Sequence, residues 1–247
     1  MKIAACYVVH YGKEYLYHSM RSVGEFVDDI HIFYTAKPSF GFVTSLVCPD
    51  IRDELRNISL SFENAIWHDV GPFNWEGEHR DYAINFLKEE GYDVALVVDS
   101  DELWDPTVLY DTLKLVEVSR HRIFRVNMMH FWRSLKWVCH DAAAPVRFIK
   151  LNANVTDEMY IPTNFKAFHM GYAQSPVIIK YKQDIHGHKA EWRQGWFENV
   201  FLPWHPGMMD VHPTNVNFWN PVRYQDEDGT LEYLLGDHSY WNMEIIK

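Results

Sequence analysis

The sequence predicts an α/β fold with a mostly parallel central sheet that is flanked by helices. The first half of the chain alternates short apolar runs with segments of helical periodicity, the order expected of strand–helix–strand units. The runs at 3–9 and 93–99 are almost continuously apolar, as in strands that are buried on both faces of a parallel sheet. Together these patterns favour parallel strands joined by helices.

Each element of the first half follows from its own local pattern. Strands are expected at 3–9, 29–35 and 65–70, where apolar, β-branched and aromatic residues dominate. Between the first two strands, apolar residues recur at helical spacing from Leu16 to Val27. We therefore expect a helix to connect these strands, as a parallel pair requires.

A second helix is expected over 75–90, followed by the strand 93–99 and a third helix. The second helix would end at Gly91, and its inward face would carry Tyr82, Ala83, Phe86 and Leu87. The third helix would have Asp105 as its N-cap and Pro106 at its first position, two residue types that suit these places.

The second half has a different pattern. Strands are expected at 123–132, 145–150 and 165–173. Ser175 and Pro176 would open a short helix that runs to about Asp184. From Glu191 on, Trp, His, Pro and Asn are frequent and periodicity is weak. We expect this C-terminal tail to cover a ligand site rather than to form a domain of its own.

The composition is that of a soluble globular protein. The 247 residues suffice for one large domain, and the net charge of −11 disfavours a surface that binds nucleic acid as a whole. Cys6, Cys48 and Cys139 form no CxxC pair, so neither a disulfide framework nor a zinc site is indicated. No run approaches the ~18 apolar residues that a membrane span needs, and no signal peptide is evident. A cytoplasmic location is therefore expected.

The stretch "LVVDSDELWDP" (96–106) places acidic residues directly after a buried strand. Asp99, Asp101 and Glu102 repel one another and are costly to hold near a core. Ligands of open α/β sheets bind beyond the carboxyl ends of the strands, which is where these acids fall. The acids suit a divalent metal, an acid–base pair or a phosphorylated nucleophile; the alternative without function is a solvated turn.

The surrounding segment, "WEGEHRDYAINFLKEEGYDVALVVDSDELWDP", resembles the donor-site region of nucleotide-sugar glycosyltransferases of the GT-A fold. In that family an apolar strand ends in an Asp-x-Asp motif, which Asp99-Ser100-Asp101 match, and an upstream helix carries a polar group, which Arg80 matches. "HYGKEYLYHSMRSV" is similar to the first strand-to-helix loop of such enzymes, and "FHMGYAQSP" to the segment that supplies a metal-binding His. The resemblance covers about residues 1–190 and implies a GT-A-like, Rossmann-like fold.

The resemblance implies one glycosyltransferase domain over 1–247, with a donor half at 1–105 and an acceptor half at 106–247 that ends in the aromatic, His-rich tail. It also implies a Mn²⁺ or Mg²⁺ ion that neutralises the diphosphate of a UDP- or GDP-sugar. The implied metal ligands are Asp99, Asp101 and His169, with His188 as the next candidate. The implied donor-binding residues are Tyr11, Arg80, Asp99 and Lys180.

The implied reaction is hexosyl or pentosyl transfer to an acceptor hydroxyl. An inverting transferase needs a carboxylate base, for which Glu191 and Asp141 are the candidates, whereas a retaining enzyme can do without one. The acceptor is expected to be a surface polysaccharide.

Two alternatives stay open. One is a phage enzyme that glycosylates a hydroxylated DNA base, for which the second half supplies local basic residues, namely Arg120, Arg122, Arg125, Arg133 and Lys136. The other is a non-catalytic sugar-binding protein, which would explain the many aromatic residues but not the acids at the strand end.

Overall fold

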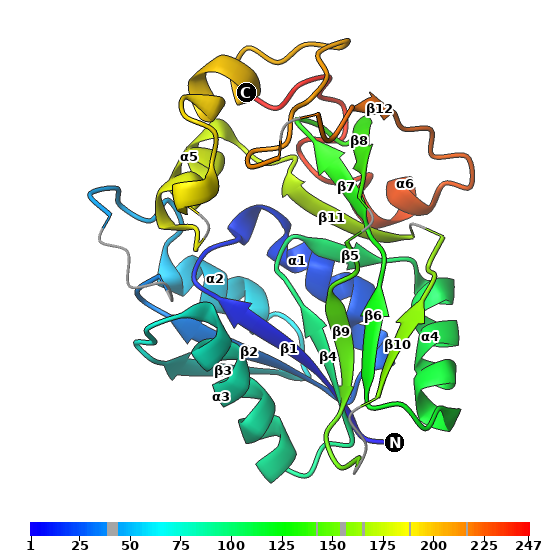
Figure 1. Ribbon diagram of the computed structural model, residues 1–247. Helices are drawn as coiled ribbons and strands as arrows, with labels where there is room; N and C mark the ends of the chain where they lie inside the picture. Colours follow the sequence, from blue (N-terminus) through cyan, green and yellow to red (C-terminus); the bar gives the residue numbers. More distant parts are fainter. Residues whose placement is uncertain (39–43, 142, 154–156, 165, 188, 216) are drawn as a thin grey trace.

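The computed structural model describes residues 1–38, 44–141, 143–153, 157–164, 166–187, 189–215 and 217–247. Two sheets form the body of the molecule, and the helices α1 to α4 surround the larger one (Figure 1). The smaller sheet lies above the larger one in this view, together with the C-terminal segments (Figure 1).

The central sheet has the strand order β10-β6-β9-β4-β1-β2-β3. In the described part of the chain its neighbouring strands pair in parallel, except that β9 runs antiparallel to both β4 and β6. The strands are β1 (Ile3–Val9), β2 (Asp29–Thr35), β3 (Ala65–Val70), β4 (Val94–Val98), β6 (Ile123–Val126), β9 (Val146–Lys150) and β10 (Glu158–Ile161). The prediction of an α/β fold with a mostly parallel central sheet flanked by helices is confirmed.

The second sheet has the order β12-β8-β7-β11-β5. Its strands are β5 (Glu102–Trp104), β7 (Met129–Trp132), β8 (Trp137–His140), β11 (Ala167–Tyr172) and β12 (Val222–Arg223). The expectation of one strand over 123–132 is wrong, because β6 and β7 belong to different sheets. The chain changes sheet at Asn127, whose side-chain Oδ1 accepts a hydrogen bond from the backbone N–H of Thr163 at 2.8 Å. Apolar periodicity continues through this change, so the pattern alone hides it.

Helices cover both faces of the central sheet. Because side chains alternate along β1, Ala5 and Tyr7 pack on one face while Ala4 and Cys6 pack on the other. The first face carries α1, α2 and α4, and the second carries α3. The helices are α1 (Lys13–Val23), α2 (Arg52–Ser59), α3 (Glu76–Glu89), α4 (Pro106–Val118), α5 (Pro176–Ile185) and α6 (Thr230–Leu235). No helix of the described chain is long and apolar enough to cross a membrane.

The inward face of α3 differs from the predicted one. Ala83 and Leu87 are buried as expected, but Tyr82 is 45% exposed and Phe86 is half-buried. The third buried residue is His79, which accompanies Ala83 and Leu87 at a spacing of four. This spacing keeps the three residues on one side of the helix and turns Tyr82 toward solvent.

The two predicted N-caps are confirmed. Asp105 accepts hydrogen bonds from the backbone N–H groups of Thr107 and Val108 at 2.8 and 3.0 Å, with Pro106 at the first helical position. Ser175 likewise caps α5, where Pro176 is the first residue. These caps fix where each helix begins next to the site described below.

The C-terminal tail packs against the second sheet. Its aromatic side chains form a buried cluster with Trp132 of β7, to which they contribute Trp192, Trp196, Phe197, Phe201, Trp204 and Trp219. Much of the high aromatic content is therefore core rather than the lining of a cleft.

Candidate functional site

A cavity of about 310 Å³ opens beyond the carboxyl ends of β1 and β4. Its wall includes five of the residues that the sequence indicated, together with Lys182 from α5. The five are Tyr11, Arg80, Asp99, Asp101 and His169. The strand ends, the loop after β1 and the helix α3 thus meet at one place, as the parallel topology of the central sheet predicts, and β11 of the second sheet joins them there.

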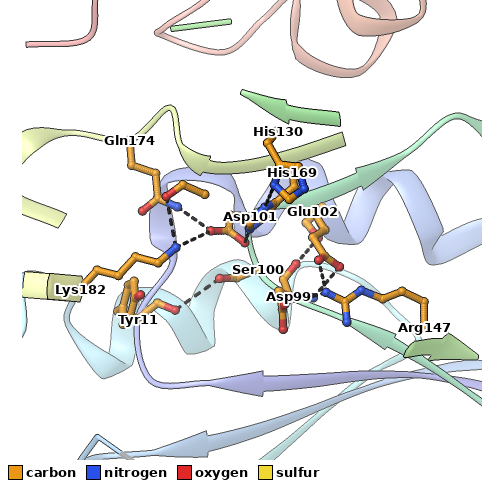
Figure 2. A network of polar contacts seen from close by, with 12 residues as sticks. Tyr11, Asp99, Ser100, Asp101, Glu102, His130, Arg147, His169, Gln174 and Lys182 are labelled. Carbon is orange, nitrogen blue, oxygen red and sulfur yellow. Dashed lines mark hydrogen bonds and ion pairs between the residues drawn. The ribbon is translucent and has the colours of Figure 1, made fainter. Parts of the chain in front are cut away.

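The side chains that contact Asp101 are a neutral amide, a lysine and a histidine. Asp101 Oδ2 accepts a hydrogen bond from the Gln174 side-chain amide at 2.7 Å and lies 3.9 Å from Lys182 Nζ (Figure 2). Its Oδ1 lies 3.5 Å from His169 Nε2. Burial raises the pKa of Asp101, and the positive charge of Lys182 opposes that rise. The carboxylate therefore lacks a full counter-charge and can take one from a ligand.

His169 faces Asp101 with one nitrogen and His130 with the other. The distance from His169 Nδ1 to His130 Nδ1 is 2.8 Å (Figure 2). Burial lowers the pKa of His169 to about 3, so the imidazole is neutral near pH 7 and has a lone pair to offer.

Gly171 makes room for this imidazole. A Cβ atom at position 171 would lie 2.5 Å from Cε1 and Nε2 of His169, closer than real contacts allow. Any side chain at this place would push the ring away from Asp101. The His-x-Gly spacing of β11 is therefore a steric requirement of the site.

Asp99 has a different environment from Asp101. Its Oδ2 lies 2.9 Å from Arg147 Nη2, and its Oδ1 lies 3.5 Å from Arg80 Nη2. Burial alone would raise the pKa of Asp99, but Arg147 and Arg80 hold it well below its ordinary value. Both carboxylate oxygens thus already face arginines.

Arg147 of β9 is the residue that the sequence analysis missed. Its side chain is 5% exposed and pairs with both Asp99 and the buried Glu102 (Figure 2). The repulsion between these two acids is therefore relieved by a buried guanidinium. No local motif indicated Arg147, because it comes from a strand 48 residues after Asp99.

The loop after β1 is fixed against the acidic turn. Gly12 has a φ of +129°, and a Cβ atom there would overlap the hydroxyl of Ser100. The backbone N–H groups of Gly12 and Lys13 donate to Asp50 Oδ2 at 2.7 and 2.9 Å. The first N–H groups of α1 are thus already occupied by a carboxylate of the protein.

The structure places Lys180 outside the cavity and Lys182 inside it. Lys180 pairs with Glu198 at 2.7 Å near the surface. Lys182 is largely buried and donates to the carbonyl oxygen of Gly171 at 3.2 Å. Two positions along a helix turn the side chain to the opposite side, so the lysine that faces the site is Lys182.

The two candidate bases do not line the cavity. Glu191 is exposed in the short helical segment Lys189–Glu191 that follows α5. Asp141 accepts a hydrogen bond from Trp219 Nε1 at 3.2 Å, and Trp219 in turn packs against the ring of His130 at 5.3 Å between centroids. Asp141 therefore lies on the far side of the histidine pair from Asp101.

Within the described part of the chain, no group of three or more His, Cys, Asp or Glu side chains is gathered closely enough to hold a metal ion by itself. The pair Asp101 and His169 is suited to a cation that takes its other ligands from phosphate oxygens and water, as Mg²⁺ commonly does. His188 lies outside the described residues.

Three of the five basic residues named for the DNA-binding alternative lie apart from one another. Arg133 is buried and its guanidinium stacks on Phe201 at 4.3 Å, whereas Arg125 pairs with Glu158 on the central sheet. Lys136 pairs with Glu244 beside the second sheet. These positions give no continuous basic surface for a nucleic-acid backbone.

No protein-family model matches the chain, and no curated protein matches it. Solved structures of low identity do. A structure of TarS residues 1–349 from S. aureus has a TM-score of 0.46 and 9% identity, over 75% of this chain and 64% of that one. TarS 1–349 in complex with UDP-GlcNAc has a TM-score of 0.39 and 16% identity, over 53% and 35%.

Glucosyl-3-phosphoglycerate synthase from Mycobacterium tuberculosis, in complex with Mn²⁺, UDP and phosphoglyceric acid, has a TM-score of 0.36 and 12% identity, over 53% of this chain and 43% of that one. The chain thus spans less than two thirds of the length of these similar structures. Since identity is this low and the TM-scores lie below 0.5, the function of the chain is inferred from the geometry of its own site.

Proposed function

We propose that the chain is a glycosyltransferase that moves a sugar from a nucleotide sugar to an acceptor hydroxyl, with a divalent cation at Asp101 and His169. The observation that carries the proposal is the placement of these two side chains, 3.5 Å apart, in a cavity beyond the carboxyl ends of parallel strands. We place the donor half at 1–105 and the acceptor half at 106–247.

The cavity supports binding of a nucleoside diphosphate. Arg80 and Lys182 line its wall and supply two positive charges that a diphosphate needs. Tyr11 lies in the same wall at the end of β1 and would contact the base of a UDP- or GDP-sugar. Asp99 would hold Arg80 toward the phosphates, because its carboxylate faces that guanidinium.

A bound Mn²⁺ or Mg²⁺ would neutralise the diphosphate and so make it a better leaving group. The protein's own part is to present the two ligands. Gln174 fixes one oxygen of Asp101, and Gly171 leaves space for the ring of His169. Burial keeps that ring neutral, as a metal ligand must be.

Asp141 and Glu191 stay the two proposed candidates for the catalytic base, and an acceptor would have to bind outside the wall described above to meet either. Asp141 is the preferred candidate because it accepts a hydrogen bond from Trp219, whose ring packs against His130. The acceptor is proposed to be a glycan such as a surface polysaccharide. We expect Asp141→Asn to lower the turnover number more than Glu191→Gln does.

The experiment that tests the function is a thermal-shift screen of nucleotides and nucleotide sugars, with and without Mn²⁺, followed by an assay of UDP or GDP release. A ligand that binds the folded state must raise the melting temperature. We expect a rise with a UDP- or GDP-sugar that is larger with Mn²⁺, and nucleotide release once an acceptor glycan is added. Binding without release under any acceptor would favour a non-catalytic sugar-binding protein. No shift with any nucleotide would refute the proposal.

A further inference from the structure

A second histidine lies directly against His169 without itself lining the cavity. His130 comes from β7 and His169 from the neighbouring strand β11, and the two residues are paired partners across these parallel strands. Their rings meet edge to face at 84°, with centroids 4.9 Å apart and the two Nδ1 atoms 2.8 Å apart (Figure 2). Because the backbone pairing fixes both residues, the contact is part of the sheet rather than a meeting of mobile side chains.

A hydrogen bond between the two Nδ1 atoms requires a proton on one of them and a lone pair on the other. Two N–H groups that point at each other repel, and so do two lone pairs, so one ring must donate and the other accept. If His169 donates from Nδ1, its Nε2 is unprotonated and points its lone pair toward Asp101. If His130 donates, His169 carries its proton on Nε2 instead.

Only the first arrangement lets His169 bind a cation. The 3.5 Å between His169 Nε2 and Asp101 Oδ1 is close to the roughly 3 Å that separates neighbouring ligands of an octahedral Mg²⁺ with bonds of about 2.1 Å. In that arrangement His130 carries its own proton on Nε2, a buried nitrogen that has no hydrogen-bond partner among the described residues. This unpaired N–H disfavours the arrangement until a cation occupies Nε2 of His169.

We propose that His130 is a positioning residue, which accepts a hydrogen bond from the Nδ1–H group of His169 and so leaves Nε2 of His169 free for a divalent cation. The inference rests on the proposed function, because it concerns the same cation. The pair carries two protons both before and after this step. The proton that His169 loses from Nε2 is matched by one that His130 gains at its own Nε2, while the shared proton moves from His130 Nδ1 to His169 Nδ1. Partners of this kind typically change metal affinity by 10- to 100-fold when they are removed.

The test compares three variants in one binding measurement. His130→Phe keeps the ring but removes the acceptor, and His130→Asn places an amide oxygen where Nδ1 was. His212→Phe is the matched control, because His212 is also partly buried and, like His130, packs against Trp219. The ring centroids of His212 and Trp219 are 4.6 Å apart. The measurement is Mn²⁺ affinity in the presence of UDP, by electron paramagnetic resonance, beside a melting curve for each protein.

We expect His130→Phe to weaken Mn²⁺ binding at least about 10-fold, and His130→Asn and His212→Phe to stay within about threefold of the wild type. Wild-type affinity in His130→Phe would overturn the inference while leaving the proposed function intact. Equal losses in His130→Phe and His130→Asn would also overturn it, because the hydrogen-bond acceptor would then not matter. A wild-type protein that binds no Mn²⁺ with UDP would overturn both.

A second measurement covers the case in which His130→Phe does not fold. In wild-type protein labelled with ¹⁵N-histidine, nitrogen chemical shifts report which ring nitrogen carries the proton. Addition of Mg²⁺ and UDP is expected to move the proton of His169 to Nδ1 and that of His130 to Nε2. Unchanged tautomers in a protein that binds Mg²⁺ would contradict the inference.

Discussion

Asp99 and Asp101 are two positions apart in the chain and lie in opposite chemical settings. Asp99 faces Arg147 and Arg80, so its charge is already balanced by the protein. Asp101 faces an amide, a lysine at 3.9 Å and a neutral imidazole, so its charge is balanced only in part. The two acids of this Asp-x-Asp motif therefore differ in how their charge is balanced. Asp99 organises the protein's own cations, whereas Asp101 is the acid that we propose for a divalent cation.

The largest expected effect comes from Asp101→Asn. We expect turnover to fall by about 1,000-fold, since a metal contributes several kcal/mol to stabilising the transition-state charge. The melting temperature should hold, because the asparagine carbonyl can still accept from Gln174 and a crowded negative charge is gone. Asp99→Asn is the comparison variant, which should lose stability. If the two variants have the same activity and the same melting curve, the two acids do not have the separate roles described above.

The second prediction concerns the arginine side of the comparison. Arg147→Met should lower the free energy of unfolding by about 3–5 kcal/mol, because it leaves Glu102 buried without its counter-charge. The double variant Arg147→Met/Glu102→Leu should regain much of this loss. Urea denaturation measures both. Arg125→Met, which breaks an exposed pair with Glu158, should cost no more than about 1 kcal/mol.

The third prediction concerns the buried neutral histidines, which make the folded protein less stable in acid. Burial lowers the pKa of His31 and of His79 to about 4. Below about pH 6.5 the unfolded chain binds protons that the folded chain does not, so stability falls as the pH drops toward 4. We expect the free energy of unfolding to decrease by roughly 2–4 kcal/mol between pH 7.5 and pH 5.

Urea titrations at pH 7.5, 6 and 5 measure this decrease. The depressed pKa of Asp99 acts in the same direction only below about pH 4. Burial raises the pKa of Glu102 to about 8, which acts in the opposite direction over this range, so the titrations also use a Glu102→Gln protein. Equal stability at pH 7.5 and pH 5 in the Glu102→Gln protein would show that these histidines become protonated in the folded protein.

The fourth prediction tests the space around His169. Gly171→Ala should weaken Mn²⁺ binding in the presence of UDP by about 10-fold, because the new methyl group displaces the ring. Gly91→Ala is the control for a general glycine effect, since a Cβ atom there meets nothing within 4 Å although its φ is +78°. A Gly171→Ala protein with unchanged metal affinity would show that the ring need not stay where the structure has it.

The smallest expected effect is that of Arg80→Ala. The Arg80 side chain is 40% exposed, and its Nη2 lies 3.5 Å from Asp99, so the donor contact that we propose for it is made by a partly solvated charge. We expect KM for the nucleotide sugar to rise about fivefold with kcat nearly unchanged, which is about 1 kcal/mol. Arg80→Lys should recover part of the loss. An unchanged KM in Arg80→Ala would remove this residue from the donor site.

The features that depend on neighbouring residues in the sequence could be predicted from local sequence patterns. The strand runs, the caps at Asp105 and Ser175, and the position of the acids beyond β4 follow from periodicity and from the physics of helix ends. The parallel topology of the central sheet then brought Tyr11 and Arg80 to the acids, as expected, whereas His169 comes from β11 of the second sheet. These features needed no knowledge of distant contacts.

Long-range pairing decided the rest. Arg147 enters the site because β9 inserts antiparallel between β4 and β6, which no spacing in the sequence indicates. Gln174 and His130 reach Asp101 and His169 through the second sheet, whose existence was hidden in an apolar run that continues past Asn127. The choice between Lys180 and Lys182 depends on the rotation of α5, which its short apolar pattern leaves undetermined.

The contact between Gly12 and Ser100 has a mechanical consequence. The backbone of Gly12 lies against the Ser100 side chain without space for a methyl group, and Ser100 Oγ also donates to the carbonyl of Tyr11 at 3.4 Å, so the two loops are mechanically coupled. We therefore expect a ligand that displaces Tyr11 to displace Asp99 and Asp101 with it. The spacing between Tyr11 and the two acids would then stay constant, and it would limit the length of the molecules that fit between them.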